Sequence, residues 1–283
     1  MNRAALLVFL LAVGCSAPVA SPPVLLTPAL SPMPTSTTTA TPPPTALPTA
    51  TAPGCLSQPG RIIVDELTAE GMARSLPYRV YLPPCFDKDA RLRYPVLILI
   101  HGLQSTDAQW DDLGVNETAD ALIRQGKLPP MVIVMPWERK GLDFEAAVVE
   151  VLLPHVREAY AGDGGREMTA IGGLSRGAGW ALRIGLQHPE TFGAIGLHSP
   201  AVLPPDMYYV PGWVKAARQA GDLPRIWIDI AERDTSKAGA NELAGVLRDL
   251  GMSYAWSSGP GEHSAGYWSS RMADYLKWYG RPW

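Results

Sequence analysis

The chain has 283 residues, of which 47% are hydrophobic, and its formal net charge is −3. A near-neutral chain lacks the basic patch that nucleic-acid-binding domains usually carry, so we expect no nucleic-acid partner. The sequence has no phosphate-binding loop and no clustered set of cysteine and histidine ligands, and we therefore expect neither a metal nor another cofactor.

The N-terminus has the layout of an export signal. A short basic start precedes an apolar run over residues 4–13, which is too short for a membrane span of about 20 residues. Residues 11–15 read Leu-Ala-Val-Gly-Cys and resemble a bacterial lipobox, which predicts that Cys15 is lipid-modified and becomes the new N-terminus. The alternative is plain secretion, with Cys15 discarded in the signal peptide. We expect an exported protein held by its lipid on the extracytoplasmic face of a bacterial membrane.

Residues 16–53 are dominated by Pro, Thr, Ala and Ser. Such a composition cannot bury enough apolar area to offset the entropy lost on ordering, and it favours an extended tether of polyproline II character. The predicted organisation is therefore a signal peptide with a lipobox cysteine over residues 1–15, a disordered tether over residues 16–53 and a folded domain over residues 54–283.

Apolar runs and turn residues divide the folded part into strands and helices. Strands are predicted at 61–67, 78–82, 96–101, 131–135, 168–172, 194–198, 226–230 and 253–256. Helices are predicted at 115–126, 142–160, 176–187, 236–250 and 267–279. The alternation after residue 96 predicts an α/β fold with a mostly parallel central sheet and helices on both faces. The first two strands follow each other directly and predict an antiparallel N-terminal edge.

Residues 173–177 read Gly-Leu-Ser-Arg-Gly, a G-x-S-x-G pentapeptide. A buried strand is predicted before it and a helix after it, which is the setting in which such a serine acts as a nucleophile. The flanking glycines permit a sharp turn, and the serine then lies at the positive end of a helix. We predict that Ser175 is the nucleophile, against the alternative of a turn with a capping serine.

An acid that could support this chemistry follows the strand at 226–230. Asp234 lies in the loop beyond the C-terminal end of that strand, where open α/β sheets place their chemistry. Asp229 is the competitor but lies inside the strand, and Glu232 is a weaker rival. We therefore assign the acid to Asp234.

The histidine is assigned to His263, which lies in a Gly/Pro-rich loop before the last helix. Only this histidine follows the acid in the chain. The others lie in another loop, inside a helix, at a helix end beside the last carbonyls, and at a strand end from which a side chain could line the site: His101, His155, His188 and His198.

These three side chains would form a nucleophilic triad. The histidine takes the serine proton during attack, and the aspartate holds the imidazole in the required tautomer. The developing oxyanion needs fixed N–H donors. We assign them to the backbone of Arg176, directly after the nucleophile, and of Leu103, in the His-Gly loop that follows the strand at 96–101.

The sequence resembles the esterase branch of the α/β-hydrolases, which includes enterochelin esterases, feruloyl esterases, S-formylglutathione hydrolases and antigen-85 mycolyltransferases. The resemblance covers roughly residues 60–280 and is closest to the enterochelin esterase-like members, whose nucleophile, acid and histidine correspond to Ser175, Asp234 and His263. It departs where Ala178 follows Gly177 and where no glycine precedes Asp234. The segments that carry it are Tyr81–Pro84, His101–Leu103, Val134–Pro136, Gly172–Gly177, His188–Phe192 and Gly261–His263.

The resemblance implies a serine carboxylic-ester hydrolase that forms an acyl-enzyme, with a small-molecule or polysaccharide-linked ester as substrate. An acyltransferase that uses the same triad is one alternative. A non-catalytic surface binding protein on a hydrolase scaffold is another. A long loop over residues 197–213 is predicted to overhang the site, with Met207, Tyr208 and Tyr209 as pocket walls.

The two cysteines of the folded part are Cys55 and Cys85. Exported chains meet an oxidising compartment, where paired cysteines usually form a bridge. We predict a disulfide between them, against the alternative of two free thiols.

Overall fold

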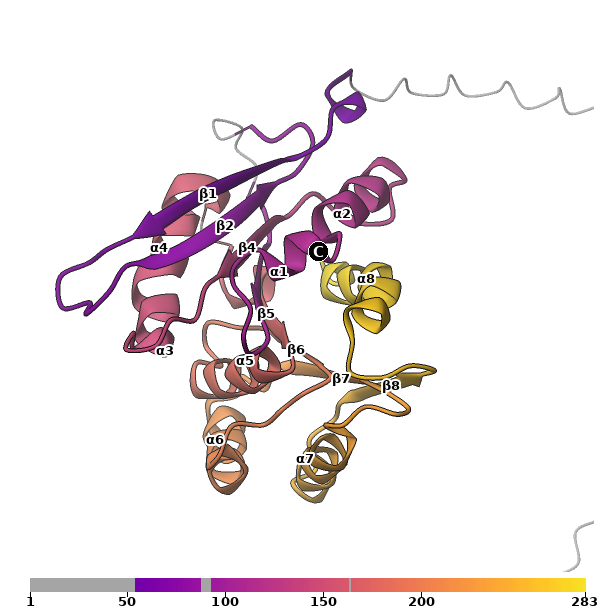
Figure 1. Cartoon of the computed structure of the whole chain (residues 1–283). Helices are drawn as coiled ribbons and strands as arrows, with labels where there is room; N and C mark the ends of the chain where they lie inside the picture. Colours follow the sequence, from indigo (N-terminus) through magenta and orange to yellow (C-terminus); the bar gives the residue numbers. More distant parts are fainter. Residues whose placement is uncertain (1–53, 88–92, 163) are drawn as a thin grey trace, which may run out of the picture. The chain divides into compact units, whose positions relative to one another are not determined.

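The computed structural model describes residues 54–87, 93–162 and 164–283 (Figure 1). The predicted lipidation at Cys15, the signal peptide and the tether over residues 16–53 lie outside the described residues, so they remain predictions.

The described residues form an eight-stranded sheet in the order β1-β2-β4-β3-β5-β6-β7-β8. The strand β2 is antiparallel to both of its neighbours, β1 and β4, and every other pair is parallel. The predicted mostly parallel sheet with an antiparallel N-terminal edge is confirmed. The strands are β1 Arg61–Leu67, β2 Leu76–Leu82, β3 Val96–Ile100, β4 Val132–Pro136, β5 Thr169–Leu174, β6 Ala194–His198, β7 Arg225–Ala231 and β8 Ala255–Gly259.

Helices cover both faces of this sheet (Figure 1). The longer ones are α2 Val115–Arg124, α5 Arg176–Gln187, α6 Asp206–Ala220, α7 Lys237–Asp249 and α8 Ala265–Gly280. A continuous helical segment comprises α3 Phe144–Ala146, η2 Ala147–Leu152, α4 Leu153–Val156 and η3 Arg157–Ala161. Short pieces are α1 Gln109–Asp112, η1 Gly54–Ser57 and η4 Arg166–Met168. In these described parts, none of the helices has the length and apolarity to cross a membrane.

The two faces of the sheet build two apolar layers, because successive side chains of a strand point to opposite sides. In β3, Val96, Ile98 and Ile100 belong to the layer under α5, α6 and α7, whereas Leu97 and Leu99 belong to the layer under α2 and α8. All five side chains of β3 are buried, as expected for a central strand covered on both faces.

One prediction about the region after β6 was wrong. Residues 206–213, predicted as the end of a long loop, form the first half of α6. The prolines at 204, 205 and 211 favoured a loop. However, buried Val210, Val214 and Ala217 recur at helical spacing. The buried carboxylate of Asp206, at the first residue of α6, pairs with Arg183 of α5 and fixes the start of the helix.

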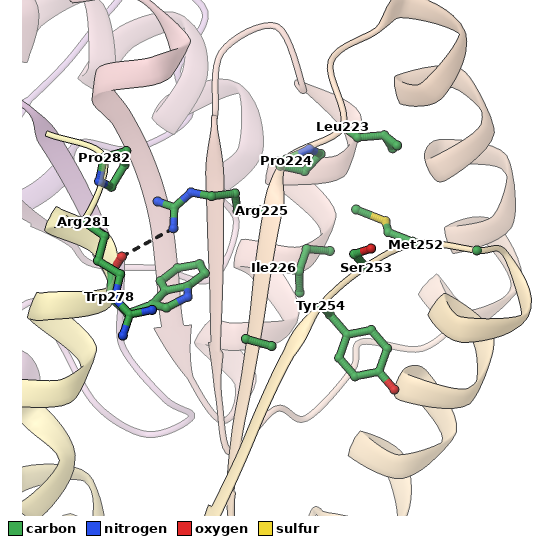
Figure 2. A pocket seen from close by; sticks show the side chains of 12 residues that line it. Leu223, Pro224, Arg225, Ile226, Met252, Ser253, Tyr254, Trp278, Arg281 and Pro282 are labelled. Atoms are coloured by element: carbon green, nitrogen blue, oxygen red, sulfur yellow. Dashed lines mark hydrogen bonds between the residues drawn. The ribbon is translucent and has the colours of Figure 1, made fainter. Parts of the chain in front are cut away.

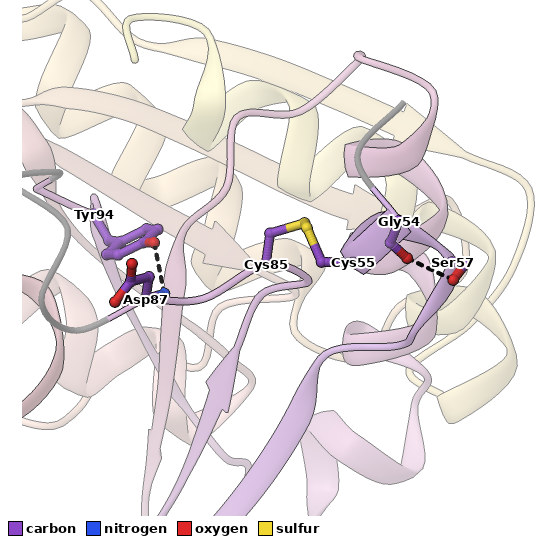
Figure 3. Close-up of a disulfide and its surroundings, with 6 residues drawn as sticks. All are labelled: Gly54, Cys55, Ser57, Cys85, Asp87 and Tyr94. Atoms are coloured by element: carbon purple, nitrogen blue, oxygen red, sulfur yellow. Dashed lines mark hydrogen bonds between the residues drawn. A yellow bond between two sulfur atoms is a disulfide. The ribbon is translucent and has the colours of Figure 1, made fainter. Parts of the chain in front are cut away.

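The N-terminal edge is tied to the end of β2 by a disulfide between Cys55 and Cys85 (Figure 3). Cys55 lies in η1, ahead of β1, and Cys85 follows β2 in the turn at residues 83–86. The bridge therefore joins the first described residues to the body of the domain.

Removal of this disulfide should lower the free energy of unfolding. The bridge spans 30 residues, and the chain-entropy model assigns a loop of that size about 3–4 kcal/mol. We expect a Cys55→Ala, Cys85→Ala double variant to unfold at a lower urea concentration. Its free energy of unfolding, measured by urea titration, should be lower by that amount. A double variant as stable as the wild type would contradict this expectation.

Candidate active site

Ser175 occupies a sharp turn between β5 and α5. Its backbone φ is 55°, a left-handed conformation that non-glycine residues seldom adopt. A Cβ on Gly173 would lie 2.3 Å from the carbonyl of Gly177, and a Cβ on Gly177 would lie 2.2 Å from the carbonyl oxygen of Ile100. Both flanking positions therefore require glycine, and the turn brings the serine to the carboxyl edge of the sheet.

His263 lies between Ser175 and Asp234. Its Nε2 is 2.9 Å from Ser175 Oγ, and its Nδ1 is 2.8 Å from Asp234 Oδ1. An ionised carboxylate only accepts hydrogen bonds, so Nδ1 carries the proton and Nε2 is free to accept one from the serine. The Asp234 side chain is fully buried and also accepts the N–H of Ser236 at 2.7 Å. The structure thus brings the three predicted residues into one hydrogen-bonded row.

The rival acid Asp229 does not bond to His263 and has other partners in the interior of the protein. It is fully buried in β7 and accepts hydrogen bonds from Tyr275, at 2.7 Å, and from Ser257. Arg271 of α8 lies 3.5 Å from the same carboxylate. These partners satisfy Asp229 inside the protein, whereas Asp234 lies three residues past the end of β7 and reaches the imidazole.

Trp268 packs against His263, and Ser199 in turn holds Trp268; neither residue was predicted to belong to the site. The ring of Trp268, in α8, meets the imidazole edge to face at 5.0 Å. Its indole N–H donates to Ser199 Oγ at 2.9 Å, at the end of β6. The Ser175 N–H in turn donates to the carbonyl of His198, the last residue of β6. The sequence signal for Trp268 was its place five residues after the histidine.

The loop that carries the predicted donor Leu103 packs directly on the nucleophile. A Cβ on Gly102 would lie 3.5 Å from Ser175 Cβ. The other predicted donor, the N–H of Arg176, belongs to the first residue of α5, where helix N–H groups lack an acceptor within the helix. The peptides of Leu103 and Arg176 therefore both lie next to Ser175.

An ion pair links the serine turn to the loop after β4. The Arg176 guanidinium donates to both carboxylate oxygens of Glu138, at 2.7 and 2.8 Å. Burial alone would raise the pKa of Glu138, but the hydrogen bonds and charge of Arg176 outweigh it and hold that pKa below its usual value. An open recess of about 400 Å³ adjoins this pair and is lined by His101, Leu103, Gln104, Ser105, Glu138, Lys140 and Arg176.

The prediction that His198 could line the site was wrong. This side chain is fully buried, stacks on Tyr275 and bonds to Tyr279 Oη at 3.0 Å. Burial lowers the pKa of His198 to about 3. His188 bonds to Glu145 at 2.9 Å rather than to the last carbonyls of its helix.

Tyr208 is 82% exposed and Tyr209 48% exposed, and neither belongs to the lining of the recess. They lie in the first turn of α6, not in a loop over the site. Their predicted role as walls of that pocket is therefore not supported by their position.

A second groove, of about 740 Å³, lies away from these residues (Figure 2). It is formed by the start of β7, the residues before β8 and the end of α8, where Arg225 donates to the Trp278 carbonyl. The triad residues follow the opposite, carboxyl ends of the parallel strands, so this groove is separate from them. Within the described ranges, no group of acidic, cysteine or histidine side chains is arranged to hold a metal ion.

The sheet topology and the serine in a strand–turn–helix elbow define a hydrolase of the α/β class. A family model described as "Putative esterase" matches residues 69–279. Because this match spans most of the chain, the chain belongs to the Esterase family, as its resemblance to the esterase branch implied.

Comparison with individual proteins gives matches to other esterases and hydrolases. An endo-1,4-beta-xylanase/feruloyl esterase from Xylanibacter ruminicola is 30% identical over an alignment of 152 residues, with 48% of this chain but only 21% of that protein covered. A ferulic acid esterase structure has a TM-score of 0.71 at 24% identity, with 80% of this chain and 99% of that chain covered. An S-formylglutathione hydrolase from Staphylococcus aureus has a TM-score of 0.66 at 16% identity, with 78% and 98% covered. At these identities the two structures establish the shared fold.

Proposed function

We propose that this protein is an exported serine esterase that cleaves carboxylic esters through Ser175, His263 and Asp234. The observation that carries the proposal is the row of contacts from Ser175 Oγ to His263 Nε2, at 2.9 Å, and from His263 Nδ1 to Asp234, at 2.8 Å. It supplies a nucleophile, a base and an orienting acid from three different loops. A hydrogen bond that only stabilises the fold needs two partners, not this ordered set of three.

The reaction proceeds in two halves. Ser175 Oγ attacks the ester carbonyl while His263 Nε2 takes the hydroxyl proton, and the imidazolium then gives that proton to the departing alcohol. Water attacks the acyl-enzyme in the same way and releases the acid. Asp234 stabilises the imidazolium in both halves. The N–H groups of Leu103 and Arg176 bind the oxyanion, where each donor contributes about 10²- to 10³-fold in rate.

The substrate we propose is a small-molecule or polysaccharide-linked ester with a polar, hydroxylated portion. The recess beside Arg176 favours it, because every residue of its lining except Leu103 has a charged or hydrogen-bonding side chain, Lys140, Gln104 and Ser105 among them. One relative is an endo-1,4-beta-xylanase/feruloyl esterase, and feruloyl esters are therefore among the candidates.

An ester panel tests this function. Purified protein should hydrolyse short-chain, feruloyl or catecholate esters faster than long-chain acyl esters, measured as kcat/KM, and should be labelled by a fluorophosphonate probe. A sugar acceptor is added in parallel to detect transfer of the acyl group. Predominant transfer would replace hydrolysis with acyltransferase chemistry, and absence of both labelling and turnover would favour the non-catalytic alternative.

The location we propose is the extracytoplasmic face of a bacterial membrane, with the domain held through a lipid on Cys15 and a tether over residues 16–53. The disulfide between Cys55 and Cys85 favours export, because such bridges persist in oxidising compartments. The sequence Val13-Gly14-Cys15 supports lipid attachment.

A Cys15→Ala variant tests the anchor. We expect wild-type protein to resist salt washing and to yield to detergent, since two or more acyl chains hold a protein firmly on a bilayer. The variant should be released or stalled in processing, with esterase activity intact. Wild-type protein found free in the medium and beginning well after Cys15 would contradict the anchor but not the esterase.

A further inference from the structure

His101, which has no part in the triad, is buried beside the nucleophile and makes two hydrogen bonds. Its Nδ1 lies 2.7 Å from the carbonyl oxygen of Gly102, and its Nε2 lies 2.9 Å from the backbone nitrogen of Glu138. A carbonyl can only accept and a backbone N–H can only donate. His101 is therefore a neutral imidazole with its proton on Nδ1, and both of its nitrogens are used.

The bond to Gly102 fixes the direction of a neighbouring N–H. The carbonyl of Gly102 and the N–H of Leu103 belong to one planar trans peptide, so they point in opposite directions. Whatever holds the carbonyl also aims the N–H. Two further contacts restrain the loop: the Gly102 N–H donates to Gln109 Oε1 at 2.7 Å, and the Ser105 N–H donates to the Gly102 carbonyl at 3.3 Å.

The bond to Glu138 extends this arrangement to the other side of the nucleophile. Glu138 gives its backbone N–H to His101 and accepts two hydrogen bonds from the Arg176 guanidinium on its carboxylate. Arg176 is the residue directly after Ser175. The loop after β3, the loop after β4 and the start of α5 are thus connected through His101 and Glu138.

We propose that His101 is a positioning residue of the oxyanion hole: it aims the Leu103 N–H by holding the Gly102 carbonyl, and Glu138 fixes the ring that does so. This role rests on the proposed function, because it assigns a task at the same reaction centre. It requires no contact between the imidazole and the substrate.

The ionisation of His101 is consistent with this role. Burial lowers the pKa of His101. The hydrogen bond to the Gly102 carbonyl and the charges of Glu138 and Asp107 raise it, but burial prevails. The ring is therefore neutral at neutral pH. An imidazolium would have no lone pair on Nε2 for the Glu138 N–H, so the neutral form is the one that the two contacts need.

A matched pair of variants separates the two bonds of His101. The amide nitrogen of asparagine is as many bonds from Cα as Nδ1, and the amide group of glutamine reaches as far as Nε2. His101→Asn can therefore still hold the Gly102 carbonyl, whereas His101→Gln can hold only the Glu138 N–H. We expect His101→Gln to lose about 10- to 100-fold in kcat with KM within about twofold, by analogy with lost oxyanion donors, and His101→Asn to recover most of that loss.

Both variants are first shown to melt within a few degrees of the wild type. If His101→Asn is no more active than His101→Gln, the proposal is overturned. A loss confined to KM in both variants would also overturn it, because an oxyanion donor acts on the transition state.

Crystal structures of the two variants give a readout that does not depend on turnover. The Gly102–Leu103 peptide should keep its orientation in His101→Asn and rotate in His101→Gln, and an unchanged peptide in His101→Gln would overturn the proposal. Ester hydrolysis that survives Ser175→Ala would instead refute the proposed function, and the peptide orientation would still decide the role of His101.

Discussion

Replacement of Ser175 by alanine should abolish ester hydrolysis and fluorophosphonate labelling together. The variant lacks the only hydroxyl in contact with His263 Nε2 in the described site, and loss of a serine nucleophile costs about 10⁴- to 10⁶-fold in kcat in triad enzymes. Both measurements can be made on one protein preparation, by initial rates on the best ester of the panel and by gel fluorescence of the probe.

The fold of Ser175→Ala should be retained. Serine and alanine both carry a Cβ, so the backbone strain at φ 55° is the same in both proteins. Ser270→Ala is a matched control, because Ser270 is an exposed serine of α8 whose hydroxyl bonds to its own helix at the Tyr267 carbonyl. Undiminished labelling of the Ser175 variant would place the nucleophile elsewhere.

The second large effect is expected at the acid. Asp234→Asn should lower kcat by about 10⁴-fold, because an amide NH₂ opposite Nδ1 favours the wrong imidazole tautomer and cannot stabilise the imidazolium. Steady-state kinetics and a melting curve of the purified variant measure this. The Ser236 N–H and His263 Nδ1 share Asp234 Oδ1, so an NH₂ at that position also leaves the Ser236 N–H without its acceptor, and the melting curve shows how much stability this loss costs.

Asp229→Asn provides the comparison at the rival position. Its side chain bonds to Tyr275 and Ser257 and lies near Arg271, whereas His263 bonds to Asp234. We expect a lower melting temperature and an activity within about tenfold of the wild type, since unpaired buried polar groups act mainly on stability. If Asp229→Asn silences the enzyme and Asp234→Asn leaves it active, the assignment of the acid is reversed.

Local patterns predicted the architecture well where a strand or helix carries its own signal. The five consecutive apolar residues of β3 mark a strand buried on both faces, and the helix after Ser175 was predicted with its observed bounds, Arg176–Gln187. The strand predicted at 253–256 begins two residues later and ends three residues later, at Ala255–Gly259. Its position is set by pairing with β7, where Trp227 lies opposite Ala255, and that pairing is long-range.

The difference between local sequence signals and long-range contacts also explains why α6 was predicted as a loop. Pro211 and Gly212 within α6, and the two prolines ahead of it, favour a loop. The burial of Val210 and Val214 against the sheet and the pairing of Asp206 with Arg183 nevertheless stabilise a helix. Tertiary packing outweighs weak local preference, and a sequence window does not contain the residues that provide the packing.

The sequence by itself determined the strand–turn–helix motif around Ser175, the chain order of acid and histidine, and the α/β class, because each depends on the types and spacing of neighbouring residues. Only the tertiary structure decided that Asp234 rather than Asp229 meets His263, that His198 is enclosed by Tyr275 and Tyr279, and that Glu138 joins His101 to Arg176. The physical reason is that hydrogen bonds depend on distances of about 3 Å between atoms. Residues far apart in the chain come within that distance only when the sheet is assembled.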